Sequence, residues 1–172
     1  MAKLCLTRRY RFSASHRLHA PRLGDGRNRE IYGKCNNPHG HGHDYLLEVT
    51  VSGRPDPRTG RLIAVAALDR FVARVVLNDL DRSNLNSVWQ EFRGDRDGGG
   101  ESCVPTTENL ARVVGARLQA AWDAEFDGAP ARLEKLRIHE TKRNIFEVRV
   151  NAPEARQERR EAVESTILKV NR

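Results

Sequence analysis

The sequence predicts an α+β fold, in which a four-stranded antiparallel sheet carries two helices on one face. The first observation behind this prediction is that strand-like segments with alternating apolar residues lie near both ends of the chain, at residues 3–14 and 144–151. The second is that residues 68–79 and 106–122 repeat apolar side chains at steps of three and four, as amphipathic helices do. The order β, β-hairpin, α, α, β-hairpin in a chain of 172 residues indicates one domain with helices on one side of the sheet.

The N-terminal part is expected to supply the first strands. Residues 3–14 form a half-buried strand and residues 43–53 a second one. Residues 17–34 contain a proline and three glycines, so we expect a long loop with a short helix at most. The turn at residues 53–60 is dense in proline and glycine, and residues 61–65 are expected to return from it as a third strand, completing a β-hairpin.

The C-terminal part is expected to form a helix and a second hairpin. The helix at residues 106–122 has Thr106 as its N-cap and Glu108 as a negative charge in its first turn. The last two strands are residues 131–140 and 144–151. Because the edges of an open sheet have to be paired or blunted, we expect subunits to pair into a ring-like oligomer.

The other segments carry no motif. Residues 80–86 are polar and irregular, and residues 93–102 are expected to form a flexible exposed loop. The domain should span residues 1–152, followed by a charged C-terminal extension at residues 153–172.

Composition narrows the classes of function. No apolar run is long enough for a membrane span, and the first residues lack the apolar core of a signal peptide. Three cysteines, an odd number, indicate reduced thiols in a cytoplasmic protein. The net charge of +7 is compatible with a nucleic-acid surface or with a polyanionic small substrate such as a phosphate ester. Since only 6% of residues are aromatic, the small substrate is favoured, and neither nucleic acid nor a membrane is expected as a partner.

Residues 35–45 hold the candidate site, with one cysteine and three histidines. His41 and His43 are two apart near the start of a strand, so they should project from the same face. His16 closes the first strand-like run and is the natural third ligand. Three neutral imidazoles suit zinc and keep a position open for substrate. In the alternative, Cys35 is a fourth ligand and closes a structural zinc site.

Several separated motifs occur in a fixed order along the chain. They are residues 12–18, 33–38, 40–45, 56–60, 80–81, 106–109 and 140–141. Through these motifs the chain resembles the 6-pyruvoyl-tetrahydropterin synthases over about residues 5 to 150. The six-residue step from Cys35 to His41 resembles the pyruvoyl branch, because the related 6-carboxy-tetrahydropterin synthases of the deazaguanine pathway commonly have a shorter one.

The resemblance implies a tunnelling fold, an oligomeric barrel in which trimers stack head-to-head into a hexamer. It also implies a zinc ion held by His16, His41 and His43, and 7,8-dihydroneopterin triphosphate as the substrate. The implied lyase reaction eliminates triphosphate and shifts hydrogens within the side chain, giving 6-pyruvoyl-tetrahydropterin. Tetrahydrobiopterin and queuosine biosynthesis both stay open as pathways.

The resemblance further implies roles for single residues. Glu140 grips the pterin ring, Cys35 is the base that acts on the side chain, and Asp81 belongs to a proton relay. The remaining substrate-binding residues are Thr106, Thr107 and Glu108. A thiol near a cation can lose its proton and accept one from carbon, and a carboxylate matches the N–H donors of a guanidine-like ring edge. Simpler roles stay open, with Asp81 as a turn cap, both threonines as helix caps and Glu140 as an exposed strand-end charge.

The sequence departs from the family pattern at Arg82, because a relay histidine normally follows the aspartate. Arginine does not release its proton in the accessible pH range. Three outcomes are open. His39 or His139 replaces the histidine, although strand alternation points His139 away from Glu140; Arg82 holds Asp81 or the phosphate tail; or the reaction is different or lost.

The leading interpretation is therefore a zinc-dependent lyase acting on dihydroneopterin triphosphate. A 6-carboxy-tetrahydropterin synthase, or a side-chain-cleaving relative, is the alternative on the same substrate. A non-catalytic pterin-binding protein is the alternative of another class. A nucleic-acid binder is least favoured, since it has no use for Cys35 beside three imidazoles.

Overall fold

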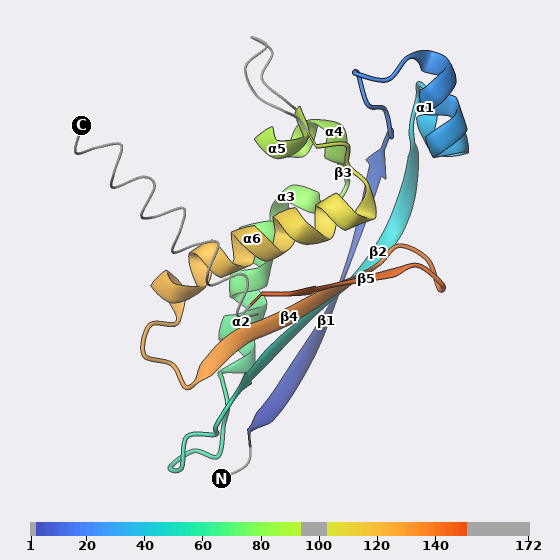
Figure 1. The fold of residues 1–172 in the computed structure, drawn as a ribbon. Coiled ribbons are helices and arrows are strands. Elements are labelled where there is room, and N and C mark those ends of the chain that lie inside the picture. Colours follow the sequence, from blue (N-terminus) through green and yellow to red (C-terminus); the bar gives the residue numbers. More distant parts are fainter. Residues whose placement is uncertain (1–2, 94–102, 151–172) are drawn as a thin grey trace, which may run out of the picture.

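The computed structural model describes residues 3–93 and 103–150, and Figure 1 shows its elements. The strands are β1 (Leu4–His16), β2 (His41–Gly53), β3 (Ser83–Asn84), β4 (Ala131–His139) and β5 (Ile145–Arg149). The helical segments are α1 (Asp25–Tyr32), η1 (Gly33–Asn36), α2 (Val65–Val72), η2 (Ala73–Leu77), α3 (Asn78–Leu80), α4 (Leu85–Val88), α5 (Gln90–Arg93) and α6 (Thr107–Glu125). Within these residues, no helix is both long and apolar enough to cross a membrane.

The strands form one sheet in the order β3-β1-β2-β4-β5. The four long strands pair antiparallel, but β3 has two residues and runs parallel to β1 at Ala14 and Ser15. The sheet is therefore five-stranded and mixed, where four antiparallel strands were predicted. The added strand forms because the chain after α3 passes along the open edge of β1, where the backbone N–H of Arg82 donates to the carbonyl of Ser13 at 2.6 Å. Two residues are too few to show a periodic pattern in the sequence.

The predicted packing of helices on one face is confirmed (Figure 1). Alternation along β1, β2 and β4 buries one row of apolar side chains under α2, η2 and α6. The largest of these side chains include Phe12, Tyr45, Leu47, Phe71, Leu110, Leu136 and Ile138. At Gly115 of α6 a Cβ would lie 3.3 Å from Leu136, so this glycine lets the helix approach the sheet closely.

The other face of the sheet is polar. Arg9 and Glu48 are register partners on β1 and β2, and Glu48 accepts a hydrogen bond from the Arg9 guanidinium at 2.9 Å. Thr7 and Thr50 are also partners, with hydroxyl oxygens 2.9 Å apart. No helix of the described residues packs a second apolar core on this face.

Residues 61–65 do not form the predicted third strand, so the hairpin predicted here was wrong. The turn before them does form, with Gly60 at φ 68°, but the chain then enters α2 at Val65. Both edges of β2 are already paired, with β1 and with β4, so no edge of β2 is left for a returning strand. Leu62 and Ile63 pack against the core instead.

The other predicted elements are present. The strands predicted at residues 3–14, 43–53, 131–140 and 144–151 are β1, β2, β4 and β5, and the long loop carries the short helix α1. The helix predicted at residues 68–79 is the continuous run α2, η2 and α3, and the one at 106–122 is α6. Most of the predicted loop at 93–102 and the whole extension at 153–172 lie outside the described residues.

Candidate functional site

The pairing of β1 with β2 brings the three predicted ligands to one face of the sheet. His16 and His41 are register partners at the end of the ladder, and His43 lies two residues further along β2. Gly40, at φ 67°, lets the chain begin β2 directly against β1. A Cβ at this position would lie 2.6 Å from the carbonyl oxygen of His16, so the close approach requires glycine.

The three imidazoles form a compact cluster. Their ring centroids are 4.9 Å (His16–His41), 5.1 Å (His16–His43) and 4.7 Å (His41–His43) apart. One ligand nitrogen from each ring lies within 4.8 Å of the others, and the Nε2 atoms of His41 and His43 are 2.9 Å apart. This arrangement is what three ligands of one metal ion require.

The tautomer of His16 also fits a metal site. Its Nδ1 lies 3.0 Å from the carbonyl oxygen of Pro105, which can only accept, so Nδ1 carries the proton. Its buried Nε2 has no hydrogen-bond partner among the described residues. A buried, unpaired nitrogen beside two further imidazoles fits a metal ion as the missing partner, with Pro105 orienting the ring.

Burial keeps the rings of His16 and His41 in the form that binds a metal. Burial lowers the pKa of His16, and the carbonyl of Pro105 only partly offsets this. Burial also lowers the pKa of His41, and the charges of His43 and Lys34 act in the same direction. The neutral imidazole is therefore favoured at His16 and at His41 at physiological pH.

Glu140 lies directly beside the cluster. Its Oε1 accepts a hydrogen bond from the hydroxyl of Thr107 at 2.6 Å and lies 3.9 Å from Nε2 of His43, and its Oε2 accepts from Nδ2 of Asn144 at 3.3 Å. Burial acts to raise the pKa of Glu140, but the hydrogen bonds from Thr107 and Asn144 and the nearby imidazoles outweigh it and hold this pKa below its usual value. The result is a fixed carboxylate that can accept paired N–H donors.

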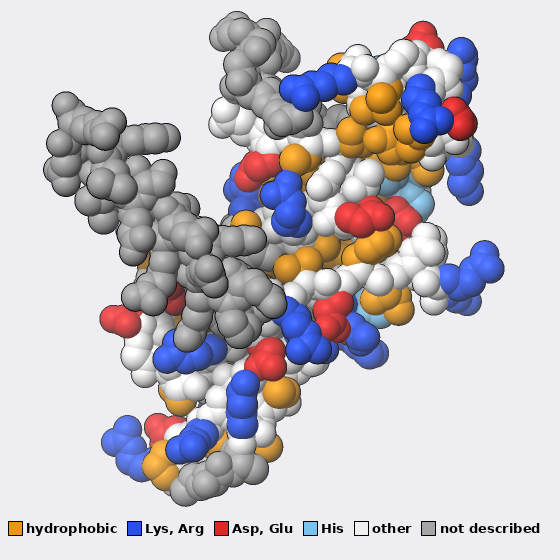
Figure 2. All heavy atoms as spheres, viewed as in Figure 1, with side chains coloured by type: hydrophobic (Ala, Val, Ile, Leu, Met, Phe, Trp, Pro, Cys, Tyr) orange, Lys and Arg blue, Asp and Glu red, His pale blue; other side chains and the backbone are white. Residues whose placement is uncertain are grey.

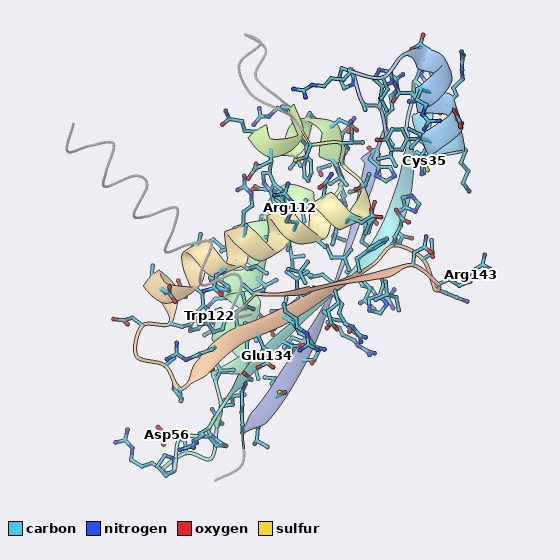
Figure 3. The ribbon with its side chains drawn as sticks, in the orientation of Figure 1. Cys35, Asp56, Arg112, Trp122, Glu134 and Arg143 are labelled. Carbon is cyan, nitrogen blue, oxygen red and sulfur yellow. The ribbon has the colours of Figure 1, made fainter. Side chains whose placement is uncertain are left out.

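Cys35 lies in η1, where the α1 segment meets the start of β2 (Figure 3). Its sulfur is not part of the histidine cluster, which favours the open metal site over the closed one. Burial raises the pKa of Cys35, the charge of Glu140 adds to this, and Lys34 opposes it. The positive charge of a bound metal ion would add to the effect of Lys34 and favour the thiolate.

Asp81 and Arg82 lie at the outer edge of β1. Asp81 accepts a hydrogen bond from the backbone N–H of Ser13 at 3.0 Å. Arg82 has a left-handed backbone, φ 58°, and its exposed guanidinium is 3.8 Å from Asp81. In the part of the chain that the structure describes, no hydrogen bond or ion pair joins either residue to the histidines or to Cys35. The contacts of Asp81 therefore match its simpler role as a backbone cap.

Neither of the two candidate replacement histidines belongs to the cluster. His139 points to the other face of the sheet from Glu140, as strand alternation predicts, and its Nε2 lies 3.5 Å from Glu48. His39 is exposed in the segment before β2.

The two threonines at the start of α6 have different hydrogen-bond partners. Thr106 is the N-cap, and its hydroxyl accepts from the backbone N–H of Asn109 at 3.3 Å. Thr107 is buried, and its hydroxyl binds Glu140 instead. Glu108 is exposed in the first turn of the helix.

Sequence reasoning missed two groups at this site, the carbonyl of Pro105 and the side chain of Asn144. The first orients His16 and the second holds Glu140. A backbone carbonyl carries no residue-type signal. Asn144 stands in a short polar turn, where asparagine is common without any function.

Comparison with known proteins identifies relatives of the whole domain. The family model described as 6-pyruvoyl tetrahydropterin synthase matches residues 5–151. The chain is 43% identical over 141 residues to the 6-pyruvoyl tetrahydrobiopterin synthase of Poecilia reticulata, covering 81% of this chain and 86% of the relative. It is 41% identical over 146 residues to the enzyme of that name from Drosophila melanogaster, covering 84% and 78%.

A solved structure agrees with the observed fold. The 6-pyruvoyl tetrahydropterin synthase of Caenorhabditis elegans superposes with a TM-score of 0.73 at 34% identity, covering 87% of this chain and 96% of that one.

Proposed function

The chain belongs to the 6-pyruvoyl tetrahydropterin synthase family, and we propose that it is a zinc-dependent lyase that converts 7,8-dihydroneopterin triphosphate into 6-pyruvoyl-tetrahydropterin. The observation that carries the proposal is the His16–His41–His43 cluster with the Glu140 carboxylate 3.9 Å from His43. Such a site combines a metal with an anchor for an N–H-rich ring.

The three histidines would hold the zinc ion, and the fourth position would be open for substrate. When bound, zinc acts as a Lewis acid on the hydroxyls of the substrate side chain. The residues of the chain then have to orient the pterin and move protons between neighbouring carbons.

Glu140 is the proposed anchor of the pterin ring. The hydrogen bonds from Thr107 and Asn144 hold its carboxylate in one place, and the low pKa keeps it charged. Two N–H groups of the ring edge can then bind this carboxylate in a two-pronged hydrogen bond.

Cys35 is the proposed base. It is half-buried next to β2 and outside the histidine cluster, so its sulfur is left to accept a proton from the substrate side chain. The positive charge of the loaded site favours its thiolate form.

The family's relay histidine has no counterpart beside Asp81, and the three outcomes predicted from the sequence stay proposals. Since His139 is turned toward Glu48, exposed His39 is the better of the two replacement histidines. Arg82 can hold a charge but cannot relay a proton. If the relay limits the rate, Arg82→His should raise turnover, with no change in zinc content; an unchanged or lower rate would exclude a missing histidine as the limit.

We also propose that the subunits form a ring-like oligomer, a hexamer made of two trimers. The outer edge of β1 is paired with β3 only at Ala14 and Ser15, and β5 is the other edge of the sheet. Leu4 and Ile145, on these two edge strands, are large apolar residues with exposed fractions of 50% and 43%. Pairing of unlike edges would cover both. The three cysteines are free, which fits the proposed cytoplasmic location.

Incubation of zinc-loaded protein with dihydroneopterin triphosphate, followed by mass spectrometry of the products, tests the proposal. The expected products are 6-pyruvoyl-tetrahydropterin and inorganic triphosphate. A carboxy product would establish the 6-carboxy-tetrahydropterin synthase reaction in its place. Stoichiometric pterin binding without turnover would establish the non-catalytic alternative.

A further inference from the structure

A cavity lies beside α1. It has a volume of about 290 Å³ and lies between β1's C-terminal extension, α1 and the loop before β2. Its charged lining residues are Arg17, Asp25, Arg29 and Lys34, and Asn36 and Asn37 add side-chain amides. Three positive charges therefore surround this cavity against one negative charge.

Two of these cations are not neutralised locally. In the described parts of the chain, Arg29 and Lys34 form no ion pair, and both residues are exposed. Figure 2 shows Lys and Arg side chains gathered around the α1 end of the molecule. A concave site with an excess of unpaired cations favours an anion of high charge.

The third cation is held in place. The Nε of Arg17 donates to the carbonyl of Asn36 at 3.4 Å, and its backbone N–H and C=O bind the side chain of Asn86 at 2.7 and 2.9 Å. Asn36 itself is buried and donates to the carbonyl of Leu18 at 2.6 Å. One wall of the cavity is therefore pre-organised, as a binding site for a ligand should be.

Two residues that line the cavity are next in sequence to a predicted metal ligand and to the thiol. Arg17 directly follows His16, and Lys34 directly precedes Cys35. Glu140 lies against the cluster, 3.9 Å from Nε2 of His43. A ligand with its ring at Glu140 and its side chain at the cluster would extend past the cluster to reach Arg17 and Lys34.

We propose that this cavity, lined by Arg17, Arg29 and Lys34, binds the polyphosphate end of the substrate. The inference rests on the proposed function for the identity of the substrate, but the chemistry of the cavity points to a polyphosphate independently. Guanidinium groups bind phosphate oxygens in pairs, and an ammonium group adds a mobile point charge. Asp25 opposes the anion and limits its affinity.

The test is calorimetric titration of inorganic triphosphate into zinc-loaded protein. Arg29→Gln combined with Lys34→Gln should weaken binding by about tenfold or more, since two charge-assisted contacts are lost. Asp25→Asn should tighten binding by about twofold or more, since one repulsive charge is removed. The KM for dihydroneopterin triphosphate should rise in the double variant, whereas the affinity for unphosphorylated dihydroneopterin should not change.

The matched control is Arg54→Gln combined with Arg61→Gln. These exposed residues flank the turn around Asp56, which lies at the opposite end of the sheet from Cys35 (Figure 3). The control double variant removes two positive charges, as does the double variant at Arg29 and Lys34. Equal weakening in both double variants would overturn the proposal, because only the net charge would then matter. Both double variants keep the three histidines. Any binding of triphosphate to zinc is therefore the same in both and does not affect the comparison.

The outcomes separate the two proposals. A wild-type protein that binds triphosphate through Arg29 and Lys34 but does not convert the substrate would refute the proposed function and keep the cavity as a polyphosphate site. Normal turnover with an unchanged KM in the double variant would refute the cavity and keep the function. If the double variant unfolds, Asp25→Asn decides alone, and unchanged affinity in that variant overturns the inference.

Discussion

Thr107 and Thr106 are adjacent residues of one type with different partners, and Thr107→Val tests the proposed anchor. The hydroxyl of Thr107 donates to Glu140 at 2.6 Å, and the residue is 3% exposed, so valine removes this donor from a buried position. A hydrogen bond to a charged group contributes about 1.5–3 kcal/mol. Glu140, whose side chain is 17% exposed, would lose its strongest hydrogen-bond donor while its burial remains.

The thermal midpoint should fall accordingly. For a chain of this size each kcal/mol corresponds to roughly 2–4 °C, so Thr107→Val should lower the midpoint by roughly 3–12 °C. Its affinity for dihydroneopterin should also fall, because the carboxylate is less firmly placed and its pKa moves upward.

Thr106→Val is the matched control. It removes the N-cap of α6, at a cost of about 1 kcal/mol, without touching Glu140. It should therefore lower the midpoint modestly and leave pterin affinity unchanged. Calorimetry of unfolding and pterin fluorescence titration measure the two effects on zinc-loaded protein. The reasoning fails if Thr107→Val binds pterin as the wild type does, or if Thr106→Val loses the same affinity.

Three further predictions address the metal, the thiol and the core. His41→Ala should release most of the zinc, because two imidazoles remain; full zinc content by atomic absorption would contradict its role. Cys35→Ala should retain stoichiometric zinc and lose more than about 100-fold in turnover, the usual range for a lost general base; loss of zinc instead would make Cys35 a ligand. Hydrogen bonds from Arg8 at 2.7 and 3.0 Å lower the pKa of Asp69 in the folded protein. The Asp69 carboxylate therefore stabilises the fold above its unfolded pKa near 4, and this stabilisation is lost as the pH falls through the lower folded pKa. Asp69→Asn should therefore lower the thermal midpoint above about pH 5 and have little effect near about pH 2, and an equal effect at both would show that the charge is not involved.

The part of this site that is local in the chain was predictable from the sequence. A strand has a side-chain period of two, so His41 and His43 had to share a face once β2 was recognised. The N-cap at Thr106 also follows from its neighbours alone. His16 was predicted as the third ligand because it closes β1, and the register of β1 with β2 confirms that the three rings meet.

The sequence by itself thus determined the α+β class, the two long helical segments, the four long strands and the shared face of His41 and His43, because each depends on short-range periodicity or on residues a few positions apart. Only the tertiary structure decided that residues 61–65 are left without a sheet edge, that Pro105 orients His16, and that Thr107 and Asn144 hold Glu140. It likewise decided that Arg17, Arg29 and Lys34 line one cavity. These contacts join segments that are separated along the chain, and whether an edge, a carbonyl or a charge finds a partner depends on which segments the packed core brings together.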